Sequence, residues 1–184
     1  MKRIAASALT AVTALLLIAI AAFACYDMVA FQPRRAEIQA LLKRAPAQDR
    51  NPPVLIRRYI LASHQADYPP TAAVARMLLA RLDVPRDGGM LAWHARTVLW
   101  DRLVWLHLSQ DEIVALYTTL SYNGSGLGLS QLSQRLYAKP LSALSEPEAA
   151  TVVAILWSPS FYLSDRSRLD RRRDLLMARV RAAR

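Results

Sequence analysis

The sequence predicts an all-α protein behind a single membrane-spanning helix, and three observations lead to this prediction. Residues 4–24 form an uncharged, mostly apolar run. Beyond it, apolar residues recur mainly at three- and four-residue spacing, which is typical of one face of an α-helix, and no long stretch alternates with a period of two. Three Ser-x-x-Glu or Ser-x-x-Asp sequences, a pattern typical of helix N-termini, precede such stretches.

Residues 1–25 are interpreted as a membrane anchor. A basic start, Lys2-Arg3, precedes an apolar run that would reach roughly 30 Å as a helix, enough to cross the hydrocarbon core of a bilayer. Tyr26 follows, where aromatic residues meet the membrane interface. A cleaved secretory signal is the alternative interpretation. Lipidation of Cys25, the lone cysteine, is another, although the leucine expected three residues before a lipidated cysteine is missing.

Residues 26–53 are expected to hold a helix and a linker. The pattern from Arg34 to Arg44 is helical, whereas Ala45 to Pro53 is polar and contains prolines. Residues 54–184 are then the main domain. Its helices are expected at residues 54–63, 72–82, 91–108, 112–120, 129–137, 148–157 and from 167 to about 180.

Local signals predict where several of these helices begin. Three predicted capping boxes are Ser109 with Glu112, Ser145 with Glu148, and Ser167 with Asp170. Thr71 is predicted to cap the helix that follows it. The helix at residues 91–108 is so apolar that we expect it in the core, with Trp93, Trp100 and Trp105 packing rather than forming a binding site.

The chain is strongly basic. Its formal net charge is +10, and removing Lys2 and Arg3 leaves +8 on residues 25–184. Such a surface beside a bilayer is attracted to anionic headgroups, and 21 of the 24 basic residues are arginine, which holds phosphate through paired donors. We therefore expect membrane lipid as a partner. Nucleic acid is not expected, because the sequence contains no recognisable nucleic-acid-binding motif.

The sequence contains no self-evident catalytic or cofactor site. The three histidines, at positions 64, 94 and 107, lack carboxylate or cysteine companions at the spacing of metal ligands, so no metal is expected. Residues 123–126, Asn-Gly-Ser-Gly, do not have the spacing of a serine-nucleophile motif, and no glycine-rich nucleotide loop occurs. We therefore expect no cofactor.

Residues 108–128, LSQDEIVALYTTLSYNGSGLG, resemble a motif of the peptidoglycan glycosyltransferases (glycosyltransferase family 51), Lys-x-x-Ile-Leu-x-x-Tyr-Leu-Asn followed by Gly. Ile113, Tyr117 and Gly124 match this motif, whereas Gln110 replaces its lysine. Further segments are similar in order along the chain: Tyr137-Ala138-Lys139-Pro140-Leu141 to Phe-Gly-Lys-Pro-Leu, Glu148-Ala149-Ala150 to Glu-Ala-Ala, Ser158-Pro159-Ser160-Phe161-Tyr162 to Ala-Pro-Ser-x-Tyr, and Arg171-Arg172 with Leu175-Leu176 to Arg-Arg-x-x-Val-Leu. The resemblance covers residues 108–180.

The resemblance implies a lysozyme-like helical domain that follows one N-terminal membrane helix. It also implies a single-pass protein of the bacterial cytoplasmic (inner) membrane, with its main domain on the periplasmic or outer face, and polymerisation of lipid II into the glycan strands of peptidoglycan. Candidate partners are then lipid II, nascent peptidoglycan and other cell-wall synthesis proteins. The candidate substrate-binding residues are Arg96, Tyr117, Gly124, Arg171 and Arg172.

The sequence departs from the family where its chemistry would occur. Residues 52–55, Pro-Pro-Val-Leu, lead to the position of the family's first catalytic glutamate, which His64 occupies. The second catalytic glutamate aligns with Thr97, and Pro69-Pro70 stands where the family has a long membrane-contacting segment. A sugar hydroxyl that attacks an anomeric carbon needs a base to take its proton. His64 is the candidate catalytic residue, because a neutral imidazole can accept a proton.

The sequence leaves three hypotheses about function open. The first is a catalytically impaired, membrane-anchored glycosyltransferase-like protein that binds lipid II or a cell-wall partner. The second is an active glycosyltransferase with a non-standard site that includes His64 and Asp67. The third is a structural helical membrane protein whose C-terminal pattern preserves only packing. Under the third hypothesis His64 is a polar residue at a helix end, and the arginines near the C-terminus belong to a solvated basic helix.

Overall fold

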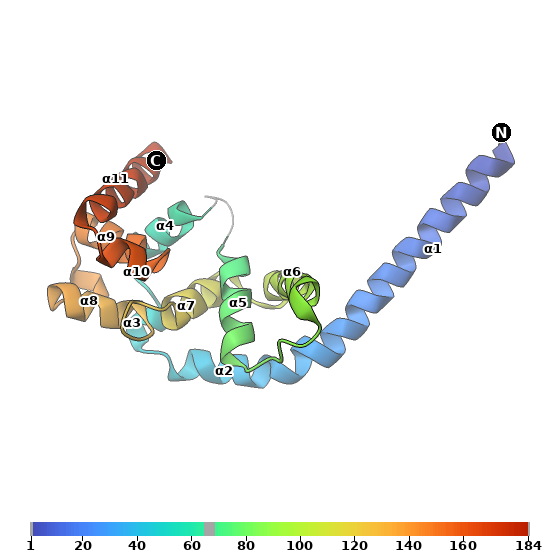
Figure 1. Cartoon of the computed structure of the whole chain (residues 1–184), viewed down its shortest axis with the longest axis horizontal. Helices are drawn as coiled ribbons and strands as arrows, with labels where there is room; N and C mark the ends of the chain where they lie inside the picture. Colours follow the sequence, from blue (N-terminus) through green and yellow to red (C-terminus); the bar gives the residue numbers. More distant parts are fainter. Residues whose placement is uncertain (1, 65–68, 184) are drawn as a thin grey trace. The chain divides into compact units, whose positions relative to one another are not determined.

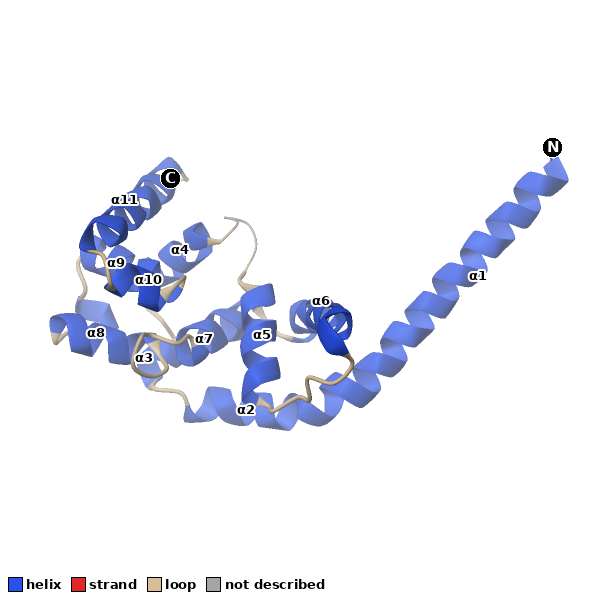
Figure 2. Cartoon of the chain, in the orientation of Figure 1, coloured by secondary structure: helices blue, strands red, loops and turns tan. Residues whose placement is uncertain are grey.

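The computed structural model describes residues 2–64 and 69–183, and these residues are all-helical, as the sequence predicts. Figure 2 shows helices joined by short loops, with no strand in the part of the chain that is described. The nearest approach to a strand pair there is an isolated antiparallel bridge between Tyr122 and Leu127. Asp67, which belongs to the second hypothesis, lies outside the described residues.

The chain divides into two compact units, Met1–Glu37 and Ile38–Arg184. The smaller unit contains α1 (Lys2–Tyr26), the π-helical turn η1 (Asp27–Phe31), the 3-10 turn η2 (Gln32–Arg34) and the first residues of α2 (Arg35–Arg44). The irregular turns adjoin Pro33, which has no backbone N–H to donate to an α-helical hydrogen bond. The helical run from Leu9 to Arg44 is long and apolar enough to cross a membrane, and none of its most apolar part is buried within the structure.

The larger unit contains the other helices, which Figure 1 labels along the chain. Their bounds are α3 Ala47–Arg50, α4 Val54–Ser63, α5 Thr71–Arg81, α6 Gly89–His107, α7 Gln110–Leu120, α8 Leu129–Tyr137, η3 Leu141–Ala143, α9 Glu146–Leu156, α10 Pro159–Leu163 and α11 Arg166–Ala182. The core forms around α7 and α9, because nearly every residue of α7 from Ile113 and of α9 from Ala149 is buried. The helix α9 packs against α4, α8, α10 and α11, and α7 packs against α3, α5 and α8.

Two of the three predicted capping boxes are confirmed, at the starts of α7 and α9. The third is wrong, because Asp165 caps α11 by accepting hydrogen bonds from the backbone N–H groups of Ser167 and Arg168. An ionised carboxylate at that position also interacts favourably with the positive end of the helix dipole. Thr71 is not a cap either: it is the first residue of α5, with Pro70 before it and no side-chain capping bond.

The expectation that residues 91–108 form a core helix holds for only one face of α6. Trp100, Leu103 and Val104 are buried, whereas Trp105 is 59% exposed. The expected linker at residues 45–53 also differs, since it contains the short helix α3 and the buried residue Asp49. Periodicity identifies apolar faces, but it does not say how many of those faces the rest of the domain covers.

Candidate functional site

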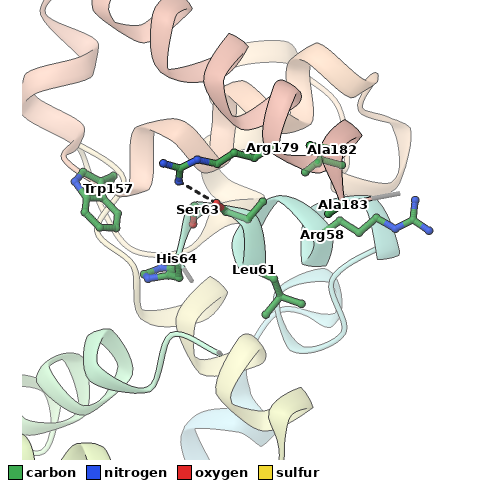
Figure 3. Close-up of a pocket in the computed structure, with 10 residues that line it drawn as sticks. Arg58, Leu61, Ser63, His64, Trp157, Arg179, Ala182 and Ala183 are labelled. Atoms are coloured by element: carbon green, nitrogen blue, oxygen red, sulfur yellow. Dashed lines mark hydrogen bonds between the residues drawn. The ribbon is translucent and has the colours of Figure 1, made fainter. Parts of the chain in front are cut away.

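A groove of about 1070 Å³ lies between the C-terminal ends of α4, α9 and α11. It is lined by apolar side chains, by His64 and Trp157, and by Arg58 and Arg179. None of the described residues that line it is acidic. In Figure 3, His64 and Trp157 lie together at one end of the groove, and Arg58 lies at the other end. We call it the large groove.

His64 is placed at the groove by the end of α4. It is the C-cap residue of that helix, with extended backbone angles that turn the chain away. Its ring packs edge-to-face against Tyr117 of α7, with ring centroids 5.2 Å apart and planes at 89°. It also lies 5.6 Å from the ring of Trp157, the residue that ends α9. Aromatic contacts from two other helices therefore fix the imidazole.

Two arginines of α11 reach the same helix end. Arg172 donates from Nη2 to the carbonyl oxygen of Ser63 at 3.5 Å, and Arg179 donates from Nη1 to that of Ala62 at 3.3 Å. The last carbonyls of a helix have no partner within the helix and carry partial negative charge, so cations are favourable there. The Arg172 guanidinium carbon also lies 5.0 Å from the centre of the Trp157 ring, a cation–π contact.

The electrostatics of the cluster keep His64 neutral at pH 7. Burial, together with the positive charges of Arg172 and Arg76, lowers the pKa of His64 from 6.5 to about 4. Burial likewise raises the pKa of Tyr117, which is 3% exposed, to about 12, so its phenol stays protonated. The site therefore presents two uncharged aromatic polar groups beside arginine cations.

Some polar atoms of this cluster lack partners. His64 Nε2 and Arg172 Nε are both buried and form no hydrogen bond with any described residue. Buried polar atoms are nearly always satisfied in folded proteins, so each exception needs an explanation. A ligand in the large groove would supply a partner for His64 Nε2, because His64 lines the groove.

A second, smaller pocket of about 260 Å³ opens on the other side of His64, beside the start of α5. His64, Trp157 and Arg76 line it together with Asp101 of α6. Asp101 Oδ1 is buried and has no hydrogen-bond partner among the described residues. A carboxylate and His64 therefore line one pocket, which we call the small pocket.

The structure gathers three of the six candidate site residues, His64, Tyr117 and Arg172, and leaves the other three elsewhere. Arg96 contacts the carbonyl of Pro85 and forms an ion pair with Asp87 at 2.8 Å, at the start of α6. That hydrogen bond lowers the pKa of Asp87. Arg96 therefore stabilises the turn that precedes its own helix.

Gly124 and Arg171 have local roles in the structure. Gly124 has φ +97° in the turn between α7 and α8, and an added Cβ there would lie 2.5 Å from Leu163 Cδ1, so the position requires glycine. Arg171 is exposed and donates to Ser167 Oγ, one turn back in α11, at 3.4 Å. Neither residue lines the large groove or the small pocket.

Sequence reasoning missed Trp157, Arg76, Arg179 and Asp101. The sequence did contain a signal for Trp157. Ser158-Pro159 ends a helix, and the aromatic residue directly before it stands at a position where a side chain is more exposed than in the interior of a helix. The other three had no signal in the sequence, because each lies on a different helix and meets the site only in the fold.

The gathered groups can bind an anion with an apolar portion, and they can transfer a proton only weakly. Arginine donors suit phosphate oxygens, and the apolar wall and Trp157 suit a chain or a ring. Among the described residues, no three histidine, cysteine or carboxylate side chains are arranged to hold a metal ion. No protein-family model matches the sequence, and no curated protein matches it.

Proposed function

We propose that this protein is a membrane-anchored, peptidoglycan glycosyltransferase-like protein that binds lipid II and does not polymerise it. The observation that carries the proposal is the large groove, in which arginines and apolar side chains meet and no lining residue is acidic. Lipid II carries a pyrophosphate between a lipid chain and sugars, so it needs cationic donors beside an apolar wall.

The family resemblance supports this choice of ligand. The segments similar to the peptidoglycan glycosyltransferases run in order from residue 108 to residue 180, and they include Tyr117 and Arg172, which lie near His64 at the edge of the groove. The proposal includes a lysozyme-like arrangement of the larger unit and insertion of the N-terminal helix in the bacterial cytoplasmic membrane. The length and composition of the helical run from Leu9 to Arg44 support this anchoring.

Binding without polymerisation is the better proposal because His64 is a poor base. A pKa of about 4 makes its imidazole less basic than an ordinary histidine, and proton removal from a sugar hydroxyl is slower for a weaker base. Tyr117, with a pKa of about 12, keeps its proton at neutral pH and cannot act as a base in its place.

One observation favours the second candidate, an active glycosyltransferase. Asp101 lies in the small pocket that His64 also lines, on the helix that contains Thr97 and one turn after it. A carboxylate there would supply the base that the sequence seemed to lack. Activity would then depend on Asp101, which distinguishes this candidate from the binding protein.

The test uses the full chain in detergent micelles with fluorescent lipid II. Binding is measured by anisotropy, and polymer is measured by gel separation of the labelled products. We expect saturable binding and no polymer, with Arg179→Gln weakening binding about tenfold or more, because Arg179 lines the groove and a charge-assisted contact to phosphate is lost. Arg171→Gln is the matched control, since Arg171 is another exposed arginine of α11 and does not line the groove.

Each other outcome selects another hypothesis. Polymer that disappears in Asp101→Asn or His64→Ala would establish an active enzyme and refute the binding-only proposal. Absence of saturable binding, in a chain whose helical circular dichroism is normal, would favour a structural protein. Equal losses in Arg171→Gln and Arg179→Gln would show attraction to a basic surface rather than binding in the groove.

A further inference from the structure

The helix α6 is apolar on two faces, and the larger unit covers only one of them. The inner face carries the buried residues Trp100, Leu103 and Val104, and α6 packs mainly against α5. Figure 1 shows α5 beside α6. Large apolar side chains that stay exposed on a second face of a helix call for a partner.

The uncovered face of α6 carries a stripe of exposed apolar side chains, with Arg102 among them. Leu91, Val98 and Trp105 are 82%, 58% and 59% exposed and lie seven residues apart, which is close to two helical turns. Met90, at 78%, and Leu106, at 55%, extend the stripe at its two ends. These five residues, which we call the outer face of α6, are spread over roughly 24 Å of helix. Large exposed apolar patches of this kind mark interaction surfaces.

The short connection to the N-terminal helix argues for a bilayer as the occupant. The apolar helix α1 ends at Tyr26, and the larger unit begins at Ile38. The intervening residues are helical and span roughly 18 Å at about 1.5 Å per residue. If α1 is inserted, the larger unit is therefore held within reach of the membrane surface.

The residues around the stripe also suit a membrane interface. Exposed Arg102 lies one turn from both Val98 and Leu106, so its guanidinium can reach headgroup phosphates while its stem covers apolar surface. Trp105 belongs to the residue type that is enriched at the headgroup level. A second copy of the chain fits less well, because pairing two stripes would place Arg102 of each copy against apolar side chains.

We propose that the outer face of α6 lies in the headgroup region of the anionic bilayer that holds the N-terminal helix. This inference rests on the anchoring in the proposed function but not on ligand binding in the large groove. The contact gives the larger unit a fixed face toward the membrane, in addition to its covalent tether.

The test is lipid quenching of single labels in the full chain. In a Cys25→Ser background, Leu91→Cys, Val98→Cys and the control Gln134→Cys, an exposed polar position on α8, are each labelled with an environment-sensitive fluorophore. The variants are reconstituted in phosphatidylglycerol-containing vesicles with or without brominated acyl chains. We expect brominated lipid to quench the labels at 91 and 98 at least about twofold and to leave the label at 134 nearly unchanged.

Three results would overturn the inference, and they can be told apart. If aqueous iodide quenches the label at 98 as strongly as it quenches the label at 134, the outer face of α6 lies in water. Cross-linking between copies through Val98→Cys, without lipid quenching, would identify a second chain as the occupant. Release of the whole chain by alkaline carbonate would show that the anchoring itself fails. Lipid II binding, measured on the same samples, reports separately on the groove.

Discussion

Two buried polar clusters in the larger unit differ in how completely their atoms are hydrogen-bonded. In the first, Asp49 of α3 is 1% exposed, and its carboxylate accepts from Ser130 N at 2.8 Å and Ser130 Oγ at 2.7 Å. Its carbonyl accepts from Thr118 Oγ1 at 2.5 Å. In the second, His64 and Arg172 each keep a buried nitrogen without a partner among the described residues.

The difference indicates which cluster holds the fold and which is available to a ligand. Asp49 acts as an N-cap for α8 from a distant part of the chain, because the cap position of that helix, Gly128, has no side chain. Such a satisfied network rigidifies a core. The unsatisfied His64 cluster lies instead at a groove, where a bound molecule can complete it. Variants in the first cluster should affect stability, and variants in the second should affect binding and titration.

The largest expected effect is on stability, from Asp49→Ala. This change removes both acceptors of Ser130 and leaves its half-buried N–H unpaired, so we expect the free energy of unfolding to fall by about 2–4 kcal/mol. Urea denaturation of the full chain in micelles, followed by circular dichroism, measures this loss.

Asp49→Asn is the matched control. Its amide oxygen can still accept from Ser130 N, and its amide N–H can donate to Ser130 Oγ. Burial raises the pKa of Asp49, which means that the charged form is disfavoured there, so losing the charge removes a desolvation cost. We expect a change of less than about 1 kcal/mol, and a loss as large as that of Asp49→Ala would mean that the charge itself holds the cluster together.

The second largest effect is the pH dependence contributed by His64. Its pKa is about 4 in the folded protein and 6.5 as the ordinary value, so the unfolded chain takes up a proton first as the pH falls. The contribution of the neutral His64 ring to the free energy of unfolding is therefore complete above about pH 6.5. It is lost as the pH falls toward 4, and the loss totals about 3 kcal/mol. The difference in unfolding free energy between wild type and His64→Gln, measured from pH 7 to pH 4, isolates this contribution. A difference that stays constant with pH would contradict the burial of the imidazole.

A smaller loss of stability is expected for Gly128→Ala. Gly128 has φ +100°, and a Cβ there would lie 2.9 Å from Asp49 Oδ2, so an alanine strains the backbone and displaces the capping carboxylate. We expect a loss of about 1–3 kcal/mol. Gly126→Ala is the control, because its Cβ would meet only the flexible end of Gln131. Equal losses in thermal unfolding of the two variants would contradict the capping role of Asp49.

The sequence predicted the features that depend on residues close together in the chain, and it missed those that depend on residues far apart. The bounds of α4 and α8 and two capping boxes were predictable, because periodicity and capping act over three or four residues. Asp49 was assigned to a linker because its partner, Ser130, is 81 residues away, and no local pattern encodes that pairing. The exposed face of α6 was missed for a related reason, since the sequence shows apolar faces without showing their partners.

The candidate site was predictable only in part. The resemblance selected His64, Tyr117 and Arg172, which the fold brings together, and also Arg96 and Gly124, which it places elsewhere. A motif reports that a residue type recurs at a position, and a recurring glycine or arginine serves a turn or a helix end as readily as a ligand.

The smallest expected effect is a shift of the His64 pKa in Arg172→Gln. Burial is the main cause of the lowered pKa, and the positive charge of Arg172 is the next, followed by that of Arg76. Removing the Arg172 charge makes protonation of the imidazole easier, so the pKa should rise toward 6.5, and Arg76→Gln should raise it less. An NMR titration of the His64 ring measures both shifts, with Arg171→Gln as the control that should leave the pKa unchanged.

Inorganic pyrophosphate bound beside Arg172 would offset the same charge, so it should raise the His64 pKa in wild type and much less in Arg172→Gln. A pyrophosphate effect of equal size in the two proteins would mean that the anion binds away from His64.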